Sequence, residues 1–254
     1  MKKSMIVFSI IIIGVFVACV NANAEIVSFS DTNKYWPGWN NGTSDDSQDV
    51  IGKPNFIGGQ AVITSRQLTN LTFNRATGTS PYWGALSPGD LFIDTGADRT
   101  WDYVVDLSSW RSSSPGNSDA GPDSYNIYSI SLALNDANGY ILSGADDTGD
   151  WKGYCIRDRH PVAAIIGTDD APFASAYFSG WGDGSTTGYS FDFNGLDLGH
   201  SGQFAIGWQP NCANDVIYET LSYHTTPEPA TMSLLGLGLA GLLRFRRKKV
   251  SSSV

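Results

Sequence analysis

The stretch at residues 125–134, YNIYSISLAL, alternates apolar side chains with small or polar ones. Tyr128, Ile130, Leu132 and Leu134 recur at every second position, the period of a β-strand with one buried face. Residues 189–193 (YSFDF) repeat the pattern with aromatic side chains. No stretch between residues 25 and 226 keeps the 3.6-residue apolar period of a helix, so these runs indicate an all-β domain.

Other short apolar runs, separated by Gly, Pro, Asn and Asp, complete the set of expected strands. About a dozen short strands without a helix predict a β-sandwich, and among sandwiches we prefer a jelly-roll-like arrangement. The expected strands cover residues 61–64, 68–73, 91–94, 101–107, 125–134, 140–142, 153–157, 162–166, 174–178, 189–193, 204–208 and 216–223.

Charge is distributed unevenly along the chain. Of its 25 acidic and 16 basic residues, two basic residues lie in residues 1–24 and five lie after residue 243. Residues 25–226 therefore carry nine basic and 24 acidic residues, a net charge near −15. Such a charge argues against nucleic acid and against an anionic membrane surface as partners. The acids are nearly all Asp, which favours turns over helices.

The first 24 residues have the parts of a secretory signal peptide. Lys2 and Lys3 precede an apolar stretch at residues 5–20, and the tripeptide ANA at residues 22–24 provides a cleavage site. An uncleaved anchor helix is one alternative. A lipoprotein attached through Cys19 is another, although residues 16–18 (FVA) make a poor lipobox. We expect an exported domain over residues 25–226.

The last thirty residues combine a turn-forming motif, an apolar stretch and a basic cluster. Pro227, Glu228 and Pro229 precede the uncharged stretch ATMSLLGLGLAGLL at residues 230–243. As a helix this stretch would be about 21 Å long, which is shorter than the bilayer core of about 30 Å. A buried C-terminal core helix is the alternative, although its glycines suit a helix interior poorly. The cations that follow are typical of a cytoplasmic stop-transfer end; they are Arg244, Arg246, Arg247, Lys248 and Lys249.

This order of motif, apolar span and basic end, over residues 227–249, resembles the PEP-CTERM sorting signal. The resemblance implies processing by an exosortase, a membrane-embedded transpeptidase-like enzyme of Gram-negative bacteria that build extracellular polysaccharide. It also implies a transient inner-membrane anchor before the protein reaches the cell surface or matrix. GDLFID at residues 89–94 and GQFAIGW at residues 202–208 look like recurring segments of uncharacterised proteins with this tail. They imply a shared β architecture and no known activity.

Removal of the signal peptide would leave two cysteines, Cys155 and Cys212. Export favours a disulfide between them, and closing a loop of nearly 60 residues would stabilise the fold by about 4 kcal/mol. Two unbonded buried thiols are the alternative. His160, His200 and His224 have no metal-ligand spacing with the cysteines, so we expect no Cys/His metal site.

The sequence contains no readable catalytic constellation. The pentapeptide GHSGQ at residues 199–203 lacks the final Gly of a G-x-S-x-G motif and is typical of a turn. Glu219 lies in an alternating run, where a solvent-facing or strand-edge position is preferred to a catalytic role. Glycoside hydrolysis needs two carboxylates across a cleft, which sequence alone does not identify. We expect no enzymatic activity, with a polysaccharide-active glycoside hydrolase or lyase as the alternative.

Two kinds of binding site are candidates. Trp36, Trp39 and Trp181 lie in Gly-, Asn- and Asp-rich segments and are candidates for stacking on sugars; filling the core is the alternative. Two acidic clusters could supply oxygen ligands to calcium, although neither has the spacing of an EF-hand loop. The alternative is that both are solvent-exposed turns. The clusters are Asp45, Asp46 and Asp49, and Asp146, Asp147 and Asp150.

We therefore expect an exported, exosortase-sorted surface or matrix protein with a structural, adhesive or glycan-binding role in extracellular polysaccharide. Its expected partners are the exosortase and, as a candidate, the polysaccharide itself. No cofactor is expected, with calcium as the candidate exception.

Overall fold

A computed structural model of the chain describes residues 24–39, 49–50, 55–76, 88–107, 123–143, 157, 159–179, 188–224 and 236–238. The chain divides into a unit of Ala24–His224 and a second unit of Met1–Asn23 with Thr225–Val254. In the second unit, residues 236–238 form a helical turn. Among the described residues, no helix has the length and apolar character needed to cross a membrane. The expected signal peptide, apart from Ala24, the sorting motif and the basic cluster lie outside the described residues.

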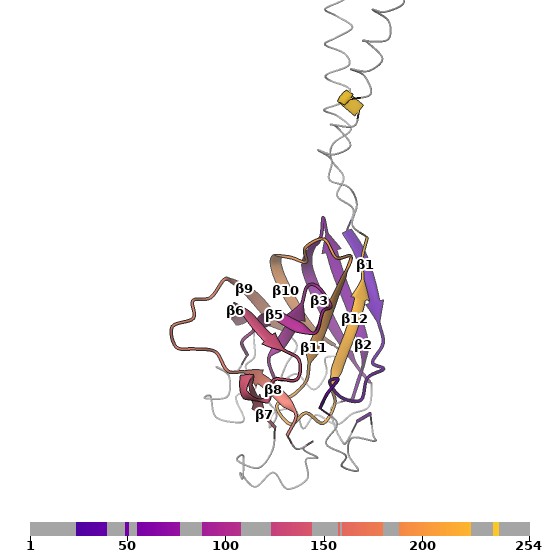
Figure 1. The fold of residues 1–254 in the computed structure, drawn as a ribbon. Helices are drawn as coiled ribbons and strands as arrows, with labels where there is room; N and C mark the ends of the chain where they lie inside the picture. Colours follow the sequence, from indigo (N-terminus) through magenta and orange to yellow (C-terminus); the bar gives the residue numbers. More distant parts are fainter. Residues whose placement is uncertain are drawn as a thin grey trace, which may run out of the picture. The chain divides into compact units, whose positions relative to one another are not determined.

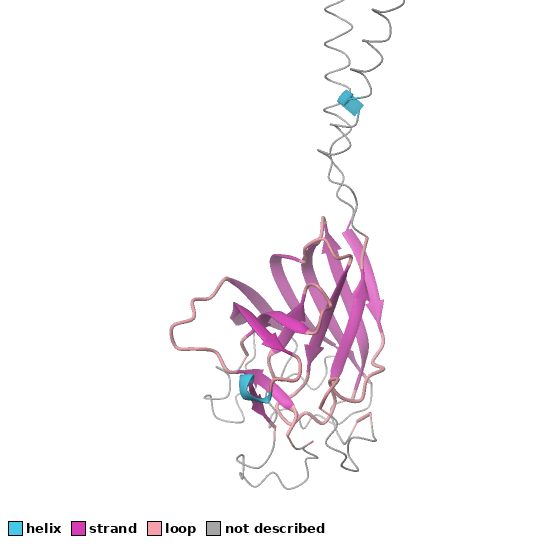
Figure 2. Ribbon diagram, viewed as in Figure 1, coloured by secondary structure: helices cyan, strands magenta, loops and turns pink. Residues whose placement is uncertain are grey.

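The unit Ala24–His224 is built almost wholly from antiparallel strands, as Figures 1 and 2 show. Ten strands form one sheet in the order β1-β2-β3-β10-β9-β6-β5-β4-β11-β12, and β7 pairs with β8 in a second, small sheet. The large sheet contains β1 (Ala24–Phe29), β2 (Phe56–Thr64), β3 (Gln67–Arg75), β4 (Leu91–Asp94), β5 (Thr100–Val105), β6 (Asp123–Ala133), β9 (Ala174–Ser179), β10 (Gly188–Asp197), β11 (Gln203–Trp208) and β12 (Ile217–Ser222). The 3-10 turn η4 (Ala137–Gly139) leads into β7 (Tyr140–Leu142), which pairs with β8 (Pro161–Ala164).

The all-β prediction is confirmed, and most of the expected runs coincide with or overlap a strand. Strand β1 was not expected, because the segment AEIVSF directly follows the anticipated cleavage site. The run expected at residues 153–157 lies outside the described residues except for Arg157.

The large sheet curls until its two edge strands lie side by side. Strands β1 and β12 are the ends of the sheet order, yet they are adjacent in space (Figure 1). The carboxylate of Glu25 accepts a hydrogen bond from the backbone N–H of His224 at 2.9 Å, and its other oxygen lies 2.7 Å from Nδ1 of the same residue. The two separate sheets of the expected jelly-roll sandwich are therefore replaced by one sheet that is nearly barrel-shaped. Curling protects strand edges that a flat sheet would leave open.

The first hydrophobic cluster, here called the inner cluster, draws on nearly every strand of the large sheet. Tyr189, Phe191 and Phe193 of β10 are all buried in it, which confirms the alternation expected there. Trp208 of β11 is fully buried, and its ring centroid lies 4.6 Å from that of Phe73. Burial of large aromatic side chains on this scale is the main source of stability for the sheet.

A second hydrophobic cluster, the outer cluster, covers the opposite face of β4, β5 and β11. Leu91 and Ile93 face the inner cluster, whereas Phe92 between them belongs to the outer cluster. The alternating side chains of β6 lie on this side too: Leu132 and, just past the strand's end, Leu134 belong to the outer cluster, and the half-buried Tyr128 and Ile130 pack against it. Strands β4, β5 and β11 are thus buried on both faces. The cover of the outer face comes from residues 30–39 and from the β7–β8 sheet.

The dipeptide Gly89-Asp90 joins these two layers. The Asp90 carboxylate accepts hydrogen bonds from the backbone N–H groups of Leu107, at 2.9 Å, and Ala164, at 3.0 Å. A Cβ atom on Gly89 would lie 2.6 Å from the carbonyl oxygens of both Val162 and Gln209, so no larger residue fits there. This junction ties β8 of the small sheet to the end of β5 in the large one.

Candidate functional site

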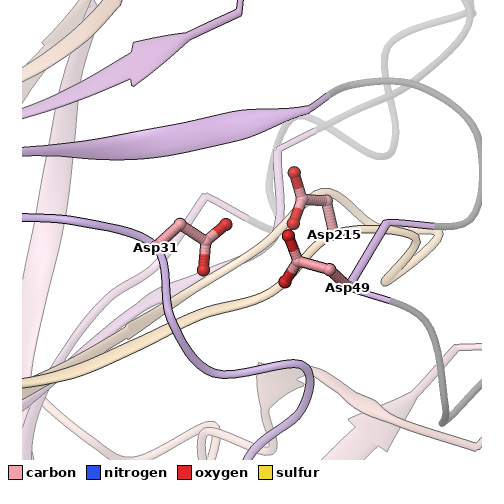
Figure 3. A group of neighbouring side chains, drawn as sticks. All are labelled: Asp31, Asp49 and Asp215. Carbon is pink, nitrogen blue, oxygen red and sulfur yellow. The ribbon is translucent and has the colours of Figure 1, made fainter.

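Three carboxylates from distant parts of the sequence meet at one place in the β unit (Figure 3). Asp31 follows β1, Asp49 lies in the connection from β1 to β2, and Asp215 precedes β12. One oxygen of each side chain lies within 4.8 Å of the others. Their side chains point toward a common space in Figure 3. Among the described residues this is the group of acidic, His or Cys side chains with a spacing that suits a metal ion.

Hydrogen bonds to β12 hold the segment that carries Asp31. The Glu219 carboxylate accepts from the Thr32 hydroxyl at 2.7 Å and from the Thr32 backbone N–H at 3.1 Å. The side chain of Asn33 donates to the carbonyl of Tyr218 at 2.6 Å. Glu219 is therefore half-buried on an edge strand and anchors a loop, as the strand-edge interpretation of this residue predicted.

Arg157 fixes the backbone around Asp49. Its fully buried guanidinium donates to the carbonyl oxygen of Asp49 at 2.9 Å and to that of Lys34. Because both carbonyls belong to segments that carry cluster acids, one side chain positions two of the three carboxylates. Asp215 is positioned from a third direction, since its Oδ2 accepts a hydrogen bond from the backbone N–H of Phe56.

The electrostatic environment disfavours the charged forms of these acids. Burial raises the pKa of Asp31 well above its usual range. The charges of Asp215 and Asp49, a side-chain hydrogen bond with Asp215 and the charge of Glu219 raise it further. Burial also raises the pKa of Asp215, assisted by the charge of Asp49, while Arg157 acts in the opposite direction. Closely spaced buried carboxylates repel one another unless a proton or a cation lies between them.

Two of the three tryptophans expected to stack on sugars are in the core. Trp36 has no exposed surface, and its ring packs 5.0 Å from that of Phe92. Trp39 is 7% exposed and donates from Nε1 to the carbonyl of Leu134 at 2.7 Å. Burial of these rings in the outer cluster corrects the expectation that they are available to a glycan. Trp181 lies outside the described residues.

The disulfide between Cys155 and Cys212 stays a prediction, because Cys155 lies outside the described residues. Cys212 is buried, and its Sγ lies 3.1 Å from the side-chain oxygen of Asn214. The carbonyl of Cys212 accepts a hydrogen bond from the N–H of Arg157 at 2.9 Å, two residues beyond Cys155 in the sequence. The backbone around Cys212 is thus adjacent to the segment that leads to Cys155.

Several other expected residues also lie outside the described part of the chain. They are Pro227, Glu228 and Pro229, the cations Arg244, Arg246, Arg247, Lys248 and Lys249, and the acids Asp45, Asp46, Asp146, Asp147 and Asp150. Among the residues expected in the two acidic clusters, the structure describes Asp49.

Comparison with known families identifies the tail. Residues 225–248 match the family described as the PEP-CTERM protein-sorting motif. The chain carries a PEP-CTERM sorting motif. This confirms the resemblance, and the motif indicates an exported, exosortase-sorted protein of the cell surface or extracellular space. The rest of this PEP-CTERM protein has no counterpart in the other comparisons, since no curated protein and no solved structure matches the chain.

Of the three carboxylates in the cluster of this PEP-CTERM protein, the sequence predicted Asp49 as a candidate calcium ligand and did not indicate Asp31 or Asp215. Asp49 stands in an acid-rich run, which is a visible signal. Asp31 and Asp215 are isolated acids separated by most of the domain, and only the approach of β1 to β12 brings them together. The one feature of the sequence that Asp31 and Asp215 share is a position beside a short apolar run near one end of the exported part.

Proposed function

We propose that an exosortase processes this PEP-CTERM protein and leaves its β unit at the cell surface or in the extracellular matrix, where it has a structural or adhesive role. The position of the motif carries this proposal. The match begins at residue 225, directly after the compact unit that ends at His224. Processing near Pro227–Pro229 would therefore remove the anchor without removing any strand of the large sheet.

The meeting of the two ends of the β unit supports the same function. Signal peptide removal before Glu25 and tail processing after His224 would cut the chain at two neighbouring points, since these residues are hydrogen-bonded to each other. Both cuts would thus fall at the same edge of the β unit. Apart from Ala24, the first residue of β1, the sheet and both hydrophobic clusters would remain intact after both cuts.

Trp36 and Trp39 are both buried, so neither ring is available to recognise a sugar. This favours a structural role within the polysaccharide. Trp181 remains the candidate for stacking on a glycan. The large negative charge of the domain keeps it soluble and unattached to anionic surfaces, which suits a component of a hydrated matrix.

Replacement of Pro227, Glu228 and Pro229 by alanine in the native host tests this function. We expect mass spectrometry of the wild-type protein to find a C-terminus upstream of the basic cluster, and we expect the protein in the extracellular or surface fraction. The variant is expected to keep residues through Lys249 and to stay in the membrane fraction. Alanine at Ser251–Ser253, beyond the matched motif, is the matched control and should leave processing unchanged. A wild-type protein that retains Lys249, or a variant processed normally, would contradict the proposal.

A further inference from the structure

We propose that Asp31, Asp49 and Asp215 bind one calcium ion, and that this ion holds the two edges of the large sheet together. The site is independent of the sorting motif and goes beyond the proposed function. It differs from both acidic clusters visible in the sequence, since it takes a single residue, Asp49, from one of them.

The spacing of the ligand atoms suits calcium. Oxygens bound to Ca²⁺ lie about 2.3–2.6 Å from the ion, so two ligands on opposite sides stand roughly 4.6–5.2 Å apart. The three carboxylate oxygens lie within 4.8 Å of one another, so their separations fall in the range spanned by oxygens around one calcium ion. Mg²⁺ demands near-ideal octahedral geometry at about 2.0–2.1 Å and usually keeps several of its waters, so a group of three protein carboxylates suits Ca²⁺ better.

Buried oxygens without hydrogen-bond donors provide the second observation. Asp215 has no exposed surface, and among the described residues its Oδ1 has no donor, although its Oδ2 accepts from Phe56. The carboxyl groups of Asp31 and Asp215 are close enough to share a proton. Apart from that mutual contact, neither oxygen of Asp31 has a donor within the described part of the chain, and both oxygens are inaccessible to solvent. A buried acceptor without a partner is costly and rare in folded proteins. A cation at the centre of the cluster would supply the missing partner to both residues at once.

The other buried aspartates that the structure describes are satisfied by backbone N–H groups. Asp90 uses both oxygens in this way, toward Leu107 and Ala164. Asp94 does the same at the β4–β5 turn, toward Gly96 and Arg99. The lack of donors is therefore a property of the carboxylate cluster and not of aspartate in this fold.

The balance of charge points in the same direction. The Glu219 carboxylate accepts hydrogen bonds from Thr32, the residue after Asp31, so a fourth carboxylate lies beside the cluster. The guanidinium of Arg157 offsets part of this negative charge. It also donates hydrogen bonds to the backbone carbonyls of Lys34 and Asp49. A divalent cation with oxygen preference is the ligand that such an excess of carboxylates recognises.

The position of the site gives calcium a structural consequence. Asp31 follows the edge strand β1, and Asp215 precedes the edge strand β12. These strands are adjacent and have no strand-to-strand pairing with each other in the sheet order. A shared ion would join them where sheet hydrogen bonds do not. Extracellular modules commonly use calcium in this way, at the millimolar concentrations found outside cells.

Calcium-dependent thermal unfolding of the full-length chain in detergent tests the site, after removal of metal with EGTA. For a dissociation constant near 0.1 mM, in the range of extracellular modules, 10 mM Ca²⁺ is about a hundredfold excess and should raise Tm by roughly 5–10 °C. Mg²⁺ at the same concentration should give a clearly smaller shift. Isothermal titration with CaCl₂ should report one site.

Asp49→Asn is the decisive variant, because Asp49 is exposed and its replacement leaves the core intact. We expect it to weaken calcium binding by about tenfold or more, since affinity follows the number of charged ligands. Asp215→Asn should abolish the shift in Tm, and Asp49→Asn keeps the test decisive if that buried variant fails to fold. Asp169→Asn, at an exposed loop position, is the matched control and should bind as the wild type does. The proposal is overturned if calcium does not shift Tm, if Mg²⁺ shifts it equally, or if Asp49→Asn binds calcium like the control.

Discussion

Asp90 offers the sharpest test of how this fold is held together, because its side chain joins two layers. Asp90→Ala would leave the backbone N–H groups of Leu107 and Ala164 without their acceptor. Both groups are buried with Asp90 itself, which has no exposed surface. The layers would still be joined at the backbone, since the Asp90 N–H donates to the carbonyl of Val162 at 2.9 Å.

The expected cost follows from the number of N–H groups left without a partner. Each buried donor that loses its acceptor costs about 1–3 kcal/mol, and hydrogen bonds to a charged acceptor lie at the upper end of such values. Asp90→Ala should therefore lower the free energy of unfolding by about 2–6 kcal/mol. Asp90→Asn keeps one acceptor oxygen and should cost roughly half as much.

Urea denaturation followed by tryptophan fluorescence measures these costs, and Trp208 is a suitable reporter because its Nε1 donates to the carbonyl of the neighbouring Gly89 at 3.1 Å. Hydrogen exchange at the Leu107 and Ala164 amides should accelerate in both variants. Asp169→Asn, exposed and distant in sequence, is the control and should change stability by less than about 0.5 kcal/mol. A loss below about 1 kcal/mol for Asp90→Ala, or unchanged exchange at Ala164, would refute the reasoning.

Three further predictions concern the closure of the sheet, the outer cluster and the cysteines. Although partial burial acts to raise it, the hydrogen bonds and charge of His224 hold the pKa of Glu25 below its usual value. The stability that this pair contributes is therefore present at neutral pH and is lost as the pH falls through the lowered pKa. Glu25→Gln should lower the free energy of unfolding by about 0.2–1 kcal/mol at pH 7 and by less in acid, which urea melts at both pH values would measure. Trp36→Ala should cost about 3–5 kcal/mol in the same assay, since the ring is fully buried; a change below 1 kcal/mol would mean that the ring is exposed in solution. Non-reducing peptide mapping should find Cys155 linked to Cys212, and reduction should lower stability by about 4 kcal/mol; labelling of both thiols before reduction would exclude the bond.

Much of the secondary structure could be predicted because each strand is encoded locally. The alternation in residues 189–193 requires only that one face of a strand be buried, and all three aromatic side chains are. Asp-rich turns are local as well. Asp94 accepts from residues two and five positions away, within the turn that it begins. Such signals need no knowledge of the partner strands.

The expectation for Trp36 and Trp39 failed for a reason that is not local. Glycine and asparagine around them favour a loop, and loops usually lie at the surface. Here the loop folds over β4, β5 and β11, so its tryptophans become the cover of a second hydrophobic cluster. Composition does not reveal that a sheet has two buried faces.

The amino-acid sequence alone determined the all-β class, the positions of most strands and the sorting motif at the C-terminus. The strands are encoded by apolar side chains at every second position. The sorting motif is recognised from the order of its parts within one contiguous stretch. Only the tertiary structure decided that ten of the strands form one curled sheet and not the two layers of a sandwich, and that Asp31, Asp49 and Asp215 lie together. Both outcomes depend on which distant strands become neighbours, and strand pairing is set by packing across the whole domain.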